Sequence, residues 1–121
     1  MATNKVNGQL QVTQTTTFDA GCSIGGGHYM KKVFGVAHSQ DVPTVTAQEV
    51  ATFNVTITGI LVADKNVTMV ETPAGYDSRL IASGNVTADD TVTVRVHNVD
   101  NNTDLNPAVA TFNIAVFEFS T

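Results

Sequence analysis

Apolar and polar residues alternate along several stretches of this chain. Over 51–58 the odd positions hold alanine, phenylalanine, valine and isoleucine, and the even positions hold threonine or asparagine. The same period of two returns over 91–97 and 110–116. Successive side chains of a β-strand point to opposite faces, so each stretch predicts a strand with one buried face. The residues that we expect in the core are Phe53, Val55, Ile57, Val94, Phe112 and Ile114.

Weaker strand and turn signals fill the rest of the chain from residue 30 onward. Further short strands are expected at 33–37, 66–71 and 79–83. Turns and loops are expected at 39–46, 72–75, 85–90 and 98–107. Gly59 is expected to mark a bulge or bend before the apolar run 60–62. Many short strands without a helical period predict an all-β protein, with a single antiparallel β-sandwich or jelly-roll-like domain over residues 30–121.

Residues 1–29 differ from this pattern and are expected to form an N-terminal arm, or an edge strand, with a glycine-rich connector. The segment 6–18 is rich in threonine and glutamine and carries a few spaced apolar residues, and glycines follow between 20 and 27. Such a segment can reach a neighbouring subunit or complete its own domain, and the sequence leaves both open. The arm residues that we predict to contact a partner are Leu10, Val12 and Phe18.

A second candidate interface lies at the end of the last strand. Phe117 and Phe119 have the opposite parity to Phe112 and Ile114 in the alternating pattern. If Phe112 and Ile114 fill the core, the two later aromatics lie on the outer face of the sheet. Exposed aromatic residues in a protein of this kind indicate a contact surface, so we predict Phe117 and Phe119 as interface residues.

Composition narrows the range of partners. The net charge is −5, and of the 6 lysines and arginines only Lys31 and Lys32 adjoin, which predicts no nucleic-acid-binding surface. No apolar run approaches the ~20 residues of a membrane-spanning helix, so no membrane partner is expected. The first residues lack the apolar core of a signal peptide, which predicts synthesis and assembly in the cytoplasm.

The histidines and the cysteine predict no metal site and no disulfide. His28, His38 and His97 are far apart in sequence and lack the short spacing that places two imidazoles on one face. His97 is expected to point outward. Cys22 is the single cysteine, so it cannot form an intramolecular disulfide.

Acidic residues and glycines that resemble chemical motifs are expected to form turns and linkers. Asp89 and Asp90 would point to opposite faces of a strand, so we expect turn residues and not a catalytic pair. The 100–104 loop could offer oxygens to calcium, although Asx-rich loops more often close turns with their own hydrogen bonds. The glycine run 25–27 lacks the strand, lysine and helix of a phosphate-binding loop. We therefore expect no enzyme, no catalytic residue, no cofactor and no metal.

The region 48–119 resembles a family of small phage-encoded structural domains. The resemblance rests on an alternating strand that ends at Thr58-Gly59, a Pro73-Ala74-Gly75 turn, the block Val86–Asn98, and the Asp104–Ala108 loop before the last strand. Members of this family look like virion components, either capsid decoration (cement) proteins or tail-associated proteins. The resemblance implies a jelly-roll-like fold and a homotrimer.

The resemblance and the absence of a recognisable active site together predict a capsid decoration protein of the virion. Its expected partners are copies of itself and the major capsid protein or other virion proteins. The alternative is a tail or fibre-tip protein that binds a host glycan or receptor through its loops. An enzyme would need two carboxylates that converge on one substrate, and the acids of this chain lie mainly in turns.

Overall fold

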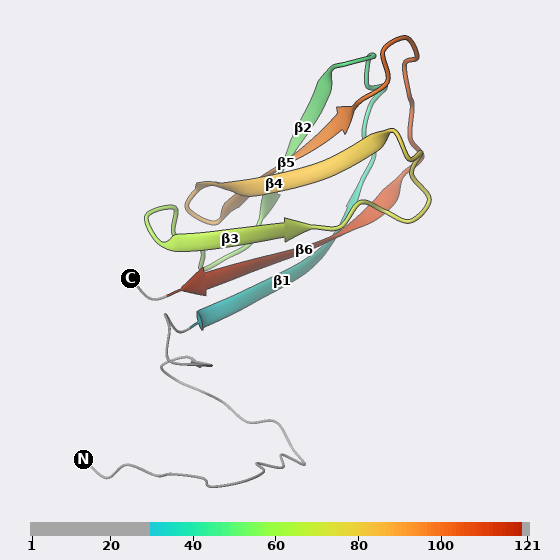
Figure 1. The fold of residues 1–121 in the computed structure, drawn as a ribbon. Helices are drawn as coiled ribbons and strands as arrows, with labels where there is room; N and C mark the ends of the chain where they lie inside the picture. Colours follow the sequence, from blue (N-terminus) through green and yellow to red (C-terminus); the bar gives the residue numbers. More distant parts are fainter. Residues whose placement is uncertain (1–29, 120–121) are drawn as a thin grey trace, which may run out of the picture.

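Two three-stranded antiparallel sheets face each other in the computed structural model, which describes residues 30–119 (Figure 1). The first sheet has the order β1-β6-β3, with β1 at Met30–Gln40, β6 at Ala110–Phe119 and β3 at Lys65–Val70. The second has the order β2-β5-β4, with β2 at Val50–Thr56, β5 at Thr91–Asn98 and β4 at Leu80–Ala88. Residues 30–119 contain no helix that could span a bilayer. The predicted all-β sandwich is confirmed.

Among the strands of residues 30–119, only the β4–β5 hairpin connects two strands of the same sheet. Its turn consists of Asp89 and Asp90, as predicted, and Asp90 adopts a positive φ of 58°. The predicted turn at 85–90 is otherwise wrong, because β4 continues to Ala88. The polar residues at the end of β4 are compatible with a strand because they pair with residues of β5. Thr87 Oγ1 lies 2.7 Å from Thr93 Oγ1 of β5.

The loop between β2 and β3 is held by the two acids of that hairpin. The Gly59 amide donates to Asp90 Oδ1 at 2.7 Å, and the Val62 amide donates to Asp89 Oδ1 at 3.0 Å. Gly59 has a φ of 102°, which confirms the predicted bend. The apolar run 60–62 after it lies outside the strands, and Ile60 turns into the core while its two successors stay exposed.

The core lies between the two sheets, and five of the six residues that are predicted to be in the core are buried there. Val55, Ile57, Val94, Phe112 and Ile114 are buried. Phe53 is only half-buried: its ring meets that of Phe112 edge-on at 5.1 Å and stacks on His38 at 5.8 Å. The loops supply further core residues, among them Val42, Val45 and Ile60.

The two long sides of the sandwich differ. At one side β3 and β4 come together, and Gly84 of β4 lets them do so (Figure 1). A Cβ on Gly84 would lie 3.0 Å from Val70 Cγ2 of β3 and 2.9 Å from the Thr93 carbonyl oxygen. At the other side, β1 and β2 carry half-buried apolar residues that pack against the core from its margin, namely Phe34, Val36, Ala51 and Phe53.

Candidate interaction surface

The outer face of the β1-β6-β3 sheet carries a ridge of apolar side chains. The register places Phe117 of β6 between Val33 of β1 and Val67 of β3. Val33 is 55% exposed and Val67 is 54% exposed, whereas Phe117 is half-buried between them. Phe119, two residues further along β6, extends the ridge toward the end of the sheet.

A hollow lies beside this ridge on the same sheet. The next row of the register holds Gly35, Ala115 and Met69, two small residues and a side chain that is 61% exposed. Met69 and Ala115 line an open hollow of about 420 Å³ together with Glu71 and Asn113. Ridge and hollow together form the apolar outer face, a name kept below for Val33, Gly35, Val67, Met69, Ala115, Phe117 and Phe119.

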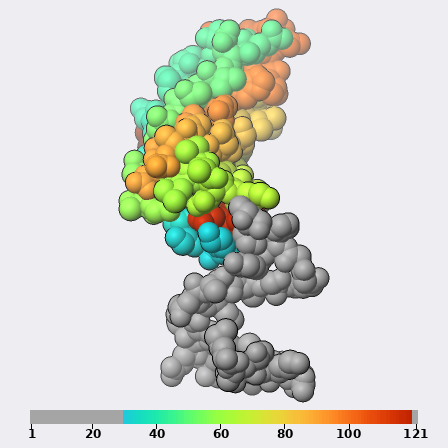
Figure 2. Space-filling view, turned by 90° about the vertical axis from the view of Figure 1, so that its left-hand side faces the viewer, coloured from blue at the N-terminus to red at the C-terminus, as the bar shows by residue number. Residues whose placement is uncertain are grey.

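The start of β1 and the end of β6 form one end of this face. Figure 2 looks onto that end and shows the start of β1, the end of β6 and the chain around residue 60 next to one another. The sequence pattern is interrupted here by Glu118, which points inward and is 2% exposed. Lys31 Nζ lies 3.3 Å from Glu118 Oε1, so the buried carboxylate is paired with a half-exposed lysine.

The outer face of the other sheet is polar by comparison. Thr93 Oγ1 donates to Asn54 Oδ1 at 2.9 Å, and Arg95 donates to Asn85 on the neighbouring strand. Hydrogen bonds between strands thus satisfy these side chains in water. The exposed apolar residues of this face are Val50 and Ile81, at the end of the sheet where His97 lies between them in the register. The asymmetry between the two faces marks the apolar outer face as the candidate interface.

The predicted interface residues fall into two groups. Phe117 and Phe119 lie on the outer face, opposite Phe112 and Ile114, as expected from the sequence. Leu10, Val12 and Phe18 lie outside the described residues. Sequence reasoning missed Val33, Val67 and Met69, which complete the surface.

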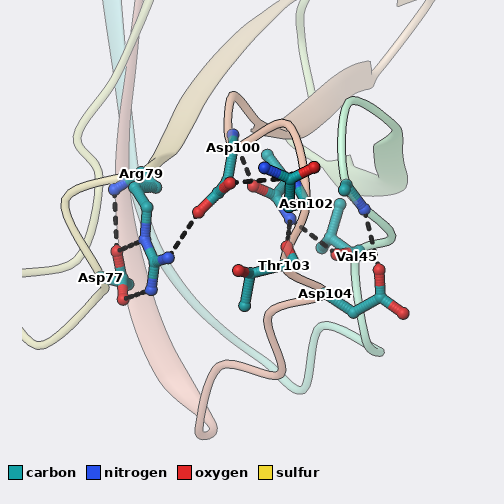
Figure 3. Close-up of polar contacts among 9 residues, drawn as sticks. Val45, Asp77, Arg79, Asp100, Asn102, Thr103 and Asp104 are labelled. Atoms are coloured by element: carbon teal, nitrogen blue, oxygen red, sulfur yellow. Dashed lines mark hydrogen bonds and ion pairs between the residues drawn. The ribbon is translucent and has the colours of Figure 1, made fainter.

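A polar network occupies the loops at the other end of the sandwich (Figure 3). Arg79 binds Asp77 through two hydrogen bonds, from Nε at 2.9 Å and from Nη2 at 2.8 Å, and its Nη1 donates to Asp100. The hydrogen bond from Arg79 holds the pKa of Asp77 well below its ordinary value, and the carboxylates raise the pKa of Arg79. The backbone amide of Asn102, and next Arg79, lower the pKa of Asp100.

The remaining polar groups of this loop hold its backbone. Asn98 is fully buried, and its Nδ2 donates to the Val45 carbonyl at 2.9 Å and to the Thr103 carbonyl at 2.8 Å. Asp104 Oδ1 accepts the Ala47 amide at 3.0 Å. The Asn102 amide donates to Asp100 Oδ1 at 3.0 Å, a side-chain-to-backbone bond of the kind expected for a turn at 100–104. Within residues 30–119, no three His, Cys, Asp or Glu side chains gather as a metal site would require.

Two of the three histidines can be placed. His38 lies on the inner face of β1, where its ring stacks on Phe53 and Nε2 lies 3.0 Å from Gln40 Oε1. His97 is exposed on the outer face of β5, as predicted. Each position has a structural partner or faces solvent, and His28 and Cys22 lie outside the described residues.

Comparisons of the chain with protein-family models, with curated proteins and with solved structures gave no match. The apolar outer face, the loop network and the fold are therefore interpreted from their own chemistry.

Proposed function

We propose that this domain is a structural module that associates with copies of itself through the apolar outer face. The observation that carries the proposal is the row Val33, Phe117 and Val67, in which two aliphatic side chains stay more than half exposed beside an aromatic ring. Removing such a surface from water stabilises an assembly by roughly 25 cal/mol per Å² of apolar area. The polar outer face of the second sheet gains nothing comparable.

A second copy fits this surface better than an unrelated partner does. The ridge and the hollow lie side by side on one face, so a ridge from one copy can enter the hollow of another. Lys65 lies at the end of β3 near the ridge and Glu71 lines the hollow, both exposed, so Lys65 of one copy can pair with Glu71 of the next in a head-to-tail contact. A contact between two different patches forms a closed ring when the rotation from one copy to the next closes after a whole number of copies. We expect a homotrimer, as the sequence resemblance implies.

The particular role that we propose is a capsid decoration protein, which binds a head lattice formed by the major capsid protein. The resemblance of Val86–Asn98 and Asp104–Ala108 to small phage structural domains supports this role. These segments form the end of β4, the hairpin, β5 and the loop before β6.

Two measurements test the proposal. Light scattering of the full-length chain over a range of concentrations should give a mass of about three chains, and a monomer throughout that range would contradict self-association. Quantitative mass spectrometry of purified particles should find copies of this chain in numbers similar to the major capsid protein. A few copies per particle would instead support a tail or fibre-tip protein, and no copies would overturn the virion role.

A further inference from the structure

We infer that the free edge of β1 accepts an added β-strand, and that this strand is residues 6–18 of a neighbouring copy. β1 is 11 residues long, the longest strand of the structure, and it pairs along one edge with β6. Among residues 30–119, no backbone hydrogen bond reaches its other edge. An unpaired edge of this length offers a row of amide and carbonyl groups for another strand.

The usual protections against strand addition are sparse along this edge. Between Val33 and Gln40, β1 has no proline and no acidic or basic residue except His38. The two lysines, Lys31 and Lys32, lie at its start. The edges of β3 and β4, by contrast, lie close to each other, and Thr72 Oγ1 accepts the amide of Ala82 in β4.

The side of the sandwich next to this edge has apolar surface to cover. Phe34 and Val36 of β1 and Phe53 of β2 pack against the core but remain partly exposed. His38 of β1 stacks on Phe53 of β2 across this side, and the partly exposed apolar surface lies beside that contact. A strand with one apolar face would complete the core here while its backbone pairs with β1.

The segment 6–18 has the required pattern. Its odd positions from 7 to 17 are all asparagine, glutamine or threonine. All of its aliphatic and aromatic residues are at even positions, namely Val6, Leu10, Val12 and Phe18. A strand with this sequence presents one apolar face and one polar face, and the apolar face would cover Phe34 and Phe53.

The length of the connector between the segment 6–18 and β1 favours a strand that comes from a neighbouring copy. Residues 19–29 could extend to about 36–40 Å, whereas hairpin loops within one chain usually have about two to five residues. This inference rests on the proposed function, because the segment can reach β1 of another copy only if copies of this chain associate. The arm then fastens one subunit to the next and leaves the head lattice to the remaining surface.

Hydrogen exchange of the full-length chain tests the inference. At concentrations where the oligomer forms, the amides on the free edge of β1, which do not bond β6, should exchange about tenfold or more slowly than the same amides of the double variant Leu10→Ser/Val12→Ser. The matched control, Gln9→Ser/Gln11→Ser, changes the polar face of the same segment and should keep the protection of β1. Equal exchange in the wild type and the Leu10→Ser/Val12→Ser variant would overturn the inference.

Hydrogen exchange at low protein concentration and the mass from light scattering distinguish the remaining outcomes of this test. Protection of the free-edge amides of β1 should disappear when the chain is diluted to a monomer. Protection of these amides that survives in the monomer would assign the added strand to its own chain and contradict the exchange between copies. Light scattering of the Leu10→Ser/Val12→Ser variant reports on the apolar outer face independently. A wild-type oligomer in which the free-edge amides of β1 are unprotected would refute only the strand inference, whereas a monomeric wild type would refute the proposed function.

Discussion

Lys31 Nζ lies 3.3 Å from Glu118 Oε1, and the carboxylate is 2% exposed while the lysine side chain is 43% exposed. A buried acid therefore depends on a cation at the start of β1. Glu118 Oε2 has no hydrogen-bond partner, so the ion pair provides its main compensation for the loss of water.

Removing the lysine should leave the carboxylate unpaired. We expect Lys31→Met to lower the free energy of unfolding by about 2 kcal/mol, because an uncompensated buried charge is costly. Urea denaturation monitored by circular dichroism would measure it. Lys32→Met is the control, since Lys32 is exposed and forms no ion pair with a described residue. If both variants lower the free energy of unfolding by the same small amount, the ion pair contributes nothing to stability. If Lys31→Met is the more destabilised, the double variant Lys31→Met/Glu118→Leu should recover most of the lost stability, because it removes the buried charge as well.

The close approach of β3 and β4 at Gly84 gives a steric prediction. Gly84→Ala places a methyl group within 3.0 Å of Val70 Cγ2 and within 2.9 Å of a backbone oxygen, so we expect a loss of about 1–3 kcal/mol. Gly35→Ala is the matched control, because its Cβ meets no atom within 4 Å. Denaturant midpoints for the two variants should differ clearly, and equal midpoints would show that β3 and β4 are not held this close.

The core can be tested through its two phenylalanines. Phe112 is fully buried, so Phe112→Ala should cost about 3–5 kcal/mol. Phe53→Ala should cost clearly less, because Phe53 is half-buried beside the open edge of β1. A loss below about 1 kcal/mol for Phe112→Ala would reverse the assignment of the inner face of β6.

Acid should weaken the network around Arg79. The pKa values of Asp77 and Asp100 are lowered in the folded state, so their stabilisation is present above the ordinary aspartate pKa of 3.8 and is lost as the pH falls below it. The difference in urea midpoint between wild type and Arg79→Met should therefore be largest near neutral pH and shrink below pH 3.8. Arg95→Met serves as a control, because Arg95 binds the neutral Asn85. An Arg79→Met difference that stays constant with pH would contradict the ionic role of Asp77 and Asp100.

The alternation of apolar and polar residues predicted the strands well because each strand carries its own buried residues at every second position. Phe112, Ile114 and the valines of β5 each repeat with a period of two, and each is buried. The end of β4 was mistaken for a turn because Asn85 and Thr87 are polar, and their partners across the sheet are not visible in the local sequence.

The apolar outer face was predicted only in part. Its ridge joins residues from three strands that are distant in sequence, so no single segment contains it. One local signal was available: Val33 and Phe34 are consecutive and both apolar, as in a strand that is covered on both faces. The pairing of Arg79 with Asp100 was missed for the same reason, since loops far apart in the chain supply the two residues.

Self-association through the apolar outer face is tested most directly by one pair of full-length variants. Val67 is 54% exposed on that face, and Ile81 is 51% exposed on the outer face of the other sheet, so each accepts a lysine with similar local disturbance. Light scattering should show that Val67→Lys is a monomer while Ile81→Lys keeps the mass of the wild-type oligomer. An unchanged oligomer for Val67→Lys, or dissociation by Ile81→Lys alone, would contradict the account.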